Sequence, residues 1–161
     1  MSALLHLYDE ALPHVYGYLV RRCDDHATAE DLTAETFMAA VHAHRAGTEV
    51  GVPWLIGTAR HKLADHWRRV GRQREAMAEL WDAAAEVADD GSPLDALHVQ
   101  AVLARLAPHH RLALTLRYLD GLPVDQVATH LDRSLHATES VLARARAAYR
   151  QVAADLEGGE R

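Results

Sequence analysis

The sequence predicts an all-α protein that is built from two small helical domains. Ala, Leu, Arg and Glu, which are strong helix formers, are spread along the whole 161-residue chain. The alternation of β-branched and polar residues that indicates half-buried strands is missing. An acidic stretch at residues 75–95, which includes DDGSP, is the best candidate for an interdomain linker. We therefore expect one domain at 1–74, a second at 96–156, and a tail at 157–161.

The first domain contains signals for three helices. Ser2 is a candidate N-cap for a first helix, which we expect to be re-set at Pro13. Asp25 is the expected N-cap of a second helix, with acidic residues in its first turn. That helix should run to about residue 46, where AGTEVGVP breaks it, and Pro53 fits the first position of a third helix.

The second domain should hold four helices, at about 95–106, 108–119, 123–131 and 134–155. Pro108 and Pro123 each stand where a helix would begin, and Asp120-Gly121 ends the helix between them. The last two segments, VDQVATHL and LHATESVLARARAAYRQV, flank a tight turn at 132–134 and have the spacing of a helix-turn-helix.

The last predicted helix has the composition of a helix that enters the major groove of DNA. Small and polar residues near its start would face base edges, and the Arg side chains farther along would face phosphates. The alternative is a helical hairpin with a purely structural purpose. We expect an apolar stripe of Leu135, Leu142, Ala145, Tyr149 and Val152, and outward or flanking positions for His136, Glu139, Ser140, Ala143, Arg144 and Arg150.

Charge is distributed in blocks along a chain whose formal net charge is −6. Residues 60–74 hold six Lys/Arg and one Asp, whereas residues 1–59 hold eight acidic residues and three Arg. Residues 75–95 hold seven acidic residues and no Lys or Arg. Such segregation indicates separate surfaces for separate partners, one of them anionic, although solvated helix faces would give the same pattern.

The basic segment WLIGTARHKLADHWRRVGRQR suits single-stranded nucleic acid. Its Lys and Arg side chains can neutralise phosphates, and Trp54 and Trp67 can offer flat faces to unstacked bases. Trp54 begins the helix beside apolar residues, so a place in the core is the alternative for it, whereas Trp67 lies nearer the basic side.

Several classes of protein are excluded or disfavoured. No run of 18 apolar residues exists, the N-terminus lacks the features of a signal peptide, and the single cysteine, Cys23, favours a cytoplasmic protein. The twelve His do not combine with Cys or carboxylates at a zinc spacing, so we expect no metal and no cofactor. No nucleophile motif or Gly-rich phosphate loop is present, which argues against an enzyme.

Two parts of the chain resemble the extracytoplasmic-function group of the sigma-70 family of transcription initiation factors. AEDLTAETFMAAVHAHR and PWLIGTARHKLADHWRRVGRQR are similar to region 2 of that family. LARLAPHHRLALTLRYLDGLPVDQVATHLDRSLHATESVLARARAAYR is similar to region 4. The two resemblances cover most of the chain, come in the right order, and are separated by a linker of fitting length.

The resemblance implies that the helix with EDLTAETF docks on the clamp helices of the largest subunit of RNA polymerase. The matching residues are Asp31, Leu32, Glu35 and Phe37, while Ala34 replaces the usual Gln. An acidic, partly apolar helix face suits a basic partner surface. Residues 75–95 would thread toward the RNA exit path.

The resemblance also implies two DNA surfaces. The basic helix would bind the minus-10 element and assist strand opening, and the loop at 46–52 would hold a flipped base. Position 61, often Asn in the family, is His61 here. The implied minus-10 residues are Trp54, Arg60, His61, Lys62, Asp65, Trp67, Arg68 and Arg69, and the implied minus-35 residues are Arg133, Ser134, His136, Ala137, Glu139, Ser140 and Arg144.

We therefore expect a sigma factor whose partners are core RNA polymerase, promoter DNA and an anti-sigma protein, with no membrane and no small-molecule substrate. One alternative is a stand-alone helix-turn-helix regulator, which leaves EDLTAETF and the basic helix without a role. Another is a polymerase-binding adaptor that has lost promoter recognition, which would fit the weak basicity of the last helix.

Overall fold

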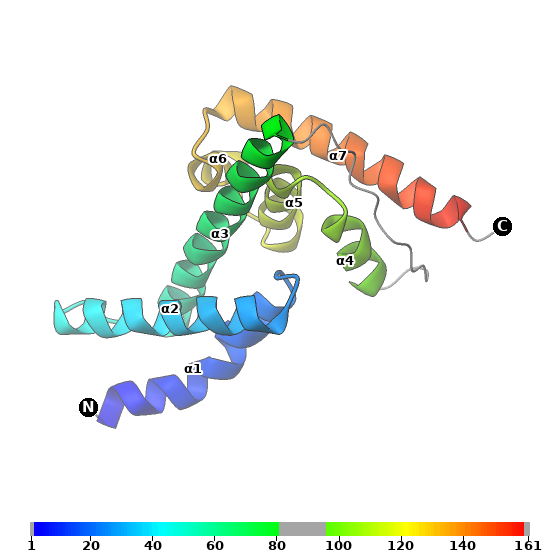
Figure 1. Cartoon of the computed structure of the whole chain (residues 1–161). Helices are drawn as coiled ribbons and strands as arrows, with labels where there is room; N and C mark the ends of the chain where they lie inside the picture. The colour runs from blue at the N-terminus through cyan, green and yellow to red at the C-terminus, as the bar shows by residue number, and fades with distance from the viewer. Residues whose placement is uncertain (1, 81–95, 160–161) are drawn as a thin grey trace. The chain divides into compact units, whose positions relative to one another are not determined.

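The computed structural model describes residues 2–80 and 96–159, which form helices joined by short loops (Figure 1). No strand occurs in these two ranges, and the all-α prediction is confirmed. None of the helices in this part of the chain is both long and apolar enough to cross a bilayer. The chain divides into two compact units, Met1–Asp65 and His66–Arg161, and the division falls inside one long helix. The expected domain limits at 74 and 96 stay a prediction.

The first unit is formed by three helices around an apolar core. α1 spans Ser2–Val20, α2 spans His26–Arg45, and α3 spans Val52–Leu80, of which the part up to Asp65 belongs to this unit. Apolar residues at helical spacing on each helix point inward and are buried. They are Ala11, Val15 and Leu19 of α1, Ala29, Leu32 and Ala40 of α2, and Leu55, Ala59 and Leu63 of α3.

The expected re-setting of the first helix at Pro13 is wrong, because α1 continues through Pro13 to Val20. A proline inside a helix removes one backbone hydrogen bond. Here Pro13 lies on the exposed side of α1, while its neighbours Ala11 and Val15 are fully buried. Burial of that apolar face against α2 offsets the lost hydrogen bond.

Both ends of α2 are capped by residues suited to the position. The Asp25 side chain accepts a hydrogen bond of 2.7 Å from the Thr28 backbone N–H, which confirms the expected N-cap. At the other end Gly47 has a φ of +88°, in the left-handed region that glycine enters without a Cβ clash. The Thr48 N–H then donates to the Ala43 carbonyl at 2.9 Å and closes the helix.

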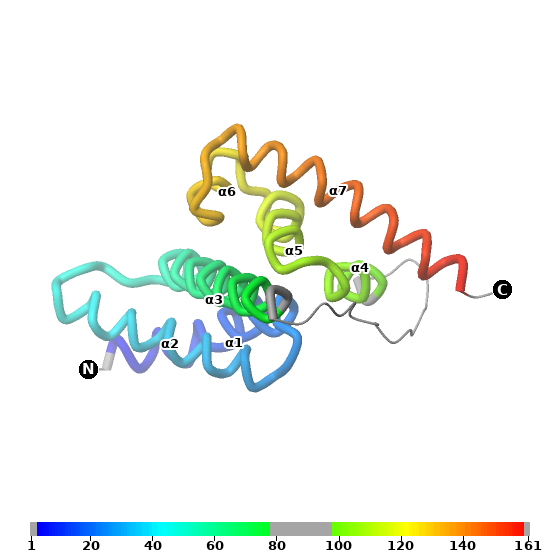
Figure 2. Tube along the Cα trace, turned by 45° about the horizontal axis from the view of Figure 1, so that its top comes forward, coloured from blue at the N-terminus to red at the C-terminus, as the bar shows by residue number. Residues whose placement is uncertain are grey.

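The second unit contains the end of α3 and the helices that follow residue 95. They are α4 (Ala96–Ala104), α5 (Pro108–Leu114), one turn of π-helix, η1 (Thr115–Leu119), α6 (Val124–Leu131) and α7 (Leu135–Gly158). The four helices expected here are therefore present, each within about three residues of its expected ends, with α5 and η1 together filling 108–119. Figure 2 shows α6 and α7 joined by a tight turn. The core includes Val102, Leu106, Leu112, Leu116, Val127, Leu131, Val141 and Leu142.

Candidate nucleic-acid and polymerase interfaces

The turn between α6 and α7 gives α7 a defined starting point. Asp132 has φ 54° and ψ 48°, a left-handed conformation that Asp tolerates better than most residues. The Arg133 N–H donates to the Ala128 carbonyl at 3.1 Å, which ends α6. The Ser134 hydroxyl then accepts from the Ala137 N–H at 3.1 Å and caps α7. The turn expected at 132–134 is therefore stabilised at both ends.

The faces of α7 agree with the sequence prediction except at two positions. Leu135, expected in the apolar stripe, is 51% exposed, whereas Val141 is completely buried. Leu135 is the first residue of the helix and has no preceding turn against which to pack, while Val141 shares the buried face with Thr138, Leu142 and Ala145. The residues expected to point outward, His136, Glu139, Ser140, Ala143, Arg144 and Arg150, are all exposed.

The implied minus-35 residues lie together at the start of α7. Arg133, Ser134, His136, Glu139, Ser140 and Arg144 are exposed, and Ala137 is half-buried. Three turns of one helix and its capping turn therefore present polar and small side chains to solvent. This is the surface that a helix needs in order to reach base edges in a major groove.

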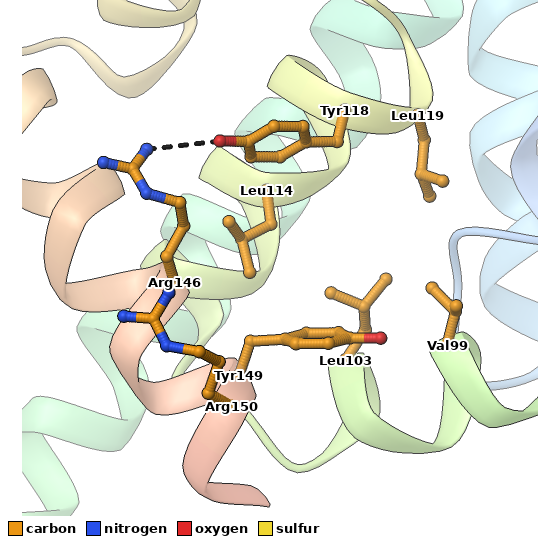
Figure 3. Close-up of a pocket in the computed structure, with 8 residues that line it drawn as sticks. All are labelled: Val99, Leu103, Leu114, Tyr118, Leu119, Arg146, Tyr149 and Arg150. Carbon is orange, nitrogen blue, oxygen red and sulfur yellow. Dashed lines mark hydrogen bonds between the residues drawn. The ribbon is translucent and has the colours of Figure 1, made fainter. Parts of the chain in front are cut away.

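On the other flank of α7 the second unit contains an apolar hollow of about 350 Å³ (Figure 3). One guanidinium N–H of Arg146 donates to the Tyr118 hydroxyl at 3.2 Å beside it. This hydrogen bond holds the side chain of Arg146 beside the hollow, away from the minus-35 residues. The lining residues are Val99, Leu103, Leu114, Tyr118, Leu119, Arg146, Tyr149 and Arg150.

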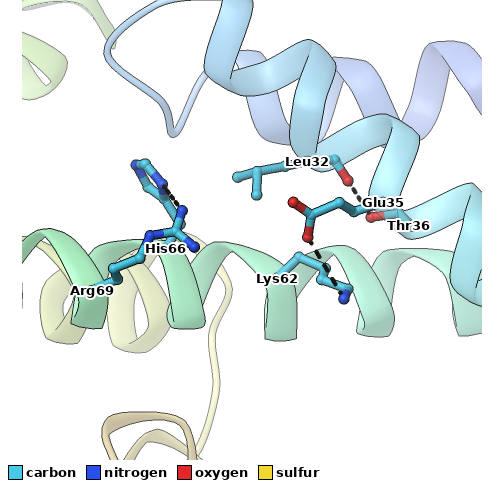
Figure 4. Close-up of polar contacts among 6 residues, drawn as sticks. All are labelled: Leu32, Glu35, Thr36, Lys62, His66 and Arg69. Atoms are coloured by element: carbon cyan, nitrogen blue, oxygen red, sulfur yellow. Dashed lines mark hydrogen bonds and ion pairs between the residues drawn. The ribbon is translucent and has the colours of Figure 1, made fainter.

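The implied minus-10 residues lie along the basic helix α3, some in the first unit and some in the second. In the first unit His61 and Asp65 are exposed, and Trp54, Arg60 and Lys62 are half-buried. Lys62 Nζ lies 3.7 Å from a Glu35 carboxylate oxygen and joins α3 to α2 (Figure 4). Trp54 thus occupies the edge of the core rather than its centre.

In the second unit the indole of Trp67 is only 4% exposed. The guanidinium carbon of Arg111 lies 4.3 Å from the ring centroid, and the His66 ring meets the indole edge-on at 5.0 Å. In this arrangement the indole offers no open face to an unstacked base. Arg69 is exposed and donates to His66 Nδ1 at 3.4 Å, and Arg68 is half-buried.

The implied polymerase residues separate into exposed and buried members. Asp31 and Glu35 are exposed on α2, as a docking face requires. Leu32 is 3% exposed and belongs to the core of the first unit, so its side chain supports that face from beneath. Phe37 is half-buried, with its ring centroid 4.7 Å from that of Tyr8 on α1.

Phe37 lies in an apolar groove that the sequence alone did not indicate. The groove has a volume of about 490 Å³ and runs between α1 and α2. Tyr8 and Met38 are exposed there, although both are large apolar residues. Tyr8 and Met38 lie on two different helices, so no sequence pattern predicts that they share a groove, which depends on how α1 packs against α2. Its lining residues are Tyr8, Leu12, Tyr16, Glu30, Thr33, Ala34, Phe37, Met38 and Val41.

Histidines do not assemble into a metal site in the described ranges. No group of three His, Cys, Asp or Glu residues there could hold a metal ion. His109 and His110, at the start of α5, do lie together, with ring centroids 4.2 Å apart. Both are half-buried in the second unit.

The fold and these surfaces define a two-unit helical protein with a helix-turn-helix whose second helix, α7, has an exposed polar start. Comparison with known families identifies each part. A family described as Sigma-70 region 2 matches residues 7–73, and one described as Sigma-70, region 4 matches residues 97–148. The chain belongs to the extracytoplasmic-function group of the sigma-70 family.

Curated relatives agree with this membership. The ECF RNA polymerase sigma factor SigM of Bacillus subtilis is 31% identical over 145 residues, which cover 87% of this chain and 88% of SigM. The ECF RNA polymerase sigma factor BldN of Streptomyces coelicolor is 35% identical over 150 residues, which cover 86% of this chain and 56% of BldN. The chain thus spans little more than half the length of BldN.

A solved structure shows the same fold. It contains the sigma factor RpoE in complex with the anti-sigma factor NepR from Bartonella quintana. The likeness has a TM-score of 0.57 at 20% sequence identity and covers 94% of this chain and 97% of the other.

Proposed function

We propose that this chain binds core RNA polymerase and directs it to promoters, with α7 reading the minus-35 element and the basic part of α3 acting at the minus-10 element. The observation that carries the proposal is the order of the two family matches, region 2 at 7–73 and region 4 at 97–148, on one chain. A protein that carries both regions has a surface for each promoter element and a surface for polymerase.

The exposed start of α7 supports the minus-35 assignment. His136, Glu139 and Ser140 are exposed and can reach base edges, and the exposed Arg133 and Arg144 can contact phosphates. Hydrogen bonds to phosphates position a helix, and contacts with base edges give it sequence preference. The face contains both kinds of side chain, so it suits sequence-specific binding.

The acidic side of α2 supports the polymerase assignment. Asp31 and Glu35 are exposed on α2, and the same helix contributes Phe37 and the acidic residue Glu30 to the apolar groove. An apolar groove with carboxylates at its edge fits a basic, amphipathic helix of a partner.

We further infer that the chain itself carries no catalytic activity, that any catalysis belongs to the polymerase, and that the protein acts in the cytoplasm. An anti-sigma protein is the proposed regulatory partner, since the structurally similar RpoE was solved in complex with the anti-sigma factor NepR. The proposed path toward the RNA exit channel concerns the linker at residues 75–95, of which 75–80 form the end of α3 and 81–95 lie outside the described residues.

Selection of promoter sequences from a random duplex pool tests the proposal. Core polymerase reconstituted with this chain should enrich duplexes that contain two separated motifs. A stand-alone helix-turn-helix regulator would enrich one motif without polymerase, and an adaptor would bind polymerase and enrich none. Either of the last two outcomes would overturn the proposal.

A further inference from the structure

The two adjacent histidines at the start of α5 have no role in the function proposed above. His109 and His110 are both half-buried, and their rings lie 4.2 Å apart at an angle of 51°. Neither residue is in the core, and neither belongs to the minus-35 set. Two imidazoles held this closely would repel each other if both were protonated in the absence of an anion.

Two arginines of the helix-turn-helix, Arg133 and Arg144, act electrostatically on this pair. Burial is the largest cause that lowers the pKa of His109, followed by the charge of Arg133, with a smaller effect of Arg144. Burial also lowers the pKa of His110 most, followed by His109, Arg144 and Arg133. Both arginines lower the pKa of both rings, and His109 and Arg133 line the same hollow in the second unit.

Acidic groups near the pair are fewer than the basic ones. Glu75 raises the pKa of His109 and partly opposes the arginines. His109 also lines a hollow of about 250 Å³ in the second unit, whose other charged lining residues are Arg68, Arg72, Glu75, Asp132 and Arg133. The surroundings therefore carry an excess of positive charge that an anion would neutralise.

The position of Arg144 connects the histidine pair to the DNA-reading face. Helical periodicity puts Ala137, Ser140 and Arg144 on one flank of α7. The Arg144 Nε–H donates to the Ser140 carbonyl at 3.3 Å, which holds the guanidinium along this flank. DNA whose major groove receives α7 would bring a phosphate strand alongside that flank.

We propose that His109 and His110, with Arg133 and Arg144, form a binding site for the DNA phosphate backbone at the edge of the minus-35 surface, and that both histidines are protonated when the phosphates bind. The ligand is a phosphodiester, and the site adds affinity without base preference. This inference rests on the proposed function, because it requires α7 to lie in a promoter.

The proposal predicts that binding to DNA becomes stronger as the pH falls. In the free chain burial and neighbouring cations lower the pKa of both histidines from its ordinary value, which favours the neutral form of both rings at pH 7. Nearby phosphates favour the charged form and raise the pKa. Each histidine that is neutral when free and charged when bound takes up one proton, so binding strengthens by up to about tenfold per histidine for each unit that the pH falls.

Promoter affinity of the holoenzyme between pH 6 and 8, at constant salt, tests this. The holoenzyme contains the full chain and core polymerase, and the probe is the promoter obtained by the selection described above. The double variant His109→Gln/His110→Gln should lose affinity mainly below pH 7 and show a shallower pH dependence than the unchanged chain. The matched control is His42→Gln/His44→Gln, which alters an exposed pair of histidines on α2 and should keep the original slope.

A variant with a permanent charge separates binding from a structural role. His110→Lys should retain affinity at pH 8 and flatten the pH dependence, which a merely structural histidine would not do. Circular dichroism confirms that each variant is folded. Identical pH slopes for the glutamine double variant and its control would overturn the proposal.

Two further outcomes are distinguished. One is a failure of the proposed function itself, and the other is a site that binds free phosphate instead of DNA. If no chain, the unchanged one included, yields a selected promoter, the proposed function itself fails and this inference with it. Inorganic phosphate alone is titrated into the free chain while the Cε1–H resonances of the two histidines are followed. Saturation at low millimolar phosphate, without any pH effect of the variants on promoter binding, would indicate a site for free phosphate and overturn the assignment to DNA.

Discussion

The guanidinium of Arg111 lies over the indole ring of Trp67, 4.3 Å from its centroid, and both side chains are almost completely buried. A buried guanidinium requires favourable contacts that replace water, and the face of an aromatic ring supplies one. The contact joins α5 to the part of α3 within the same compact unit. It also covers the ring that the sequence suggested as a platform for unstacked bases.

This contact should contribute measurably to stability. Arg111→Met keeps the length of the side chain and removes its charge, and we expect it to lower the free energy of unfolding by about 1–2 kcal/mol. A double-mutant cycle with Trp67→Leu, measured by urea unfolding, isolates the pairwise energy. The exposed Arg150→Met should change stability by less than about 0.5 kcal/mol. A coupling energy of zero would show that the two residues are merely adjacent.

Reversing the charge of Asp31 should weaken binding to core polymerase. Asp31 is exposed, so Asp31→Arg should leave the fold intact, whereas Glu35 pairs with Lys62 and its reversal would disturb the packing of α2 on α3. Loss of a charge partner at an interface costs about 2–5 kcal/mol, so the Kd should rise by at least about 30-fold. Fluorescence-detected titration of labelled chain with core enzyme measures this.

The control for Asp31 is Glu157→Arg, which makes the same charge change at an exposed position near the end of α7. Its Kd should stay close to that of the unchanged chain. Equal Kd values for the two variants would remove α2 from the polymerase interface.

Glu139 and Arg144 should affect promoter recognition in different ways. Glu139 is exposed on the DNA-reading face, where a carboxylate can accept a hydrogen bond from the N4 amino group of cytosine. Glu139→Gln should relax preference at one base pair of the minus-35 element by about 1–3 kcal/mol. Arg144→Ala should weaken all promoters alike and reduce the salt dependence. Transcription from single-base promoter variants distinguishes the two, and an unaltered preference profile for Glu139→Gln would show that it reads no base.

The free chain should bind duplex DNA poorly. Residues 1–59 and 75–95 carry an excess of acidic residues and repel phosphates, and the net charge of the chain is −6. In the proposed complex, polymerase covers the first segment and takes up the second. Promoter affinity measured by fluorescence anisotropy should therefore increase greatly on addition of core enzyme. Tight, sequence-specific duplex binding by the free chain at physiological salt would contradict this.

Helix positions were largely predictable because their signals are local. Asp25, Pro108 and Ser134 act through neighbouring backbone groups, and a local signal survives whatever the tertiary packing is. The expectation at Pro13 was wrong because the lost backbone hydrogen bond is a local effect, whereas the burial of α1 against α2, which offsets it, depends on the packing of the whole unit.

Contacts between helices could not be obtained from the same local signals. The burial of Trp67 depends on Arg111, which is far away in the sequence, and the groove at Tyr8 depends on how α1 packs against α2. Leu135 is exposed although it was expected in the apolar stripe, because a stripe drawn from periodicity does not say where the helix begins to pack, and the buried Val141 was not included in that stripe. Residue types thus identified the surfaces, and the tertiary packing decided which side chains remain accessible.

Run-off transcription is the most direct test of the central claim that this chain directs initiation. The reaction contains core polymerase, the purified chain and a linear template that carries the selected promoter. We predict a transcript of defined length that requires the chain and disappears when either promoter motif is scrambled. Core polymerase that binds the chain yet makes no promoter-dependent transcript, or makes the same transcript without the chain, would contradict the claim.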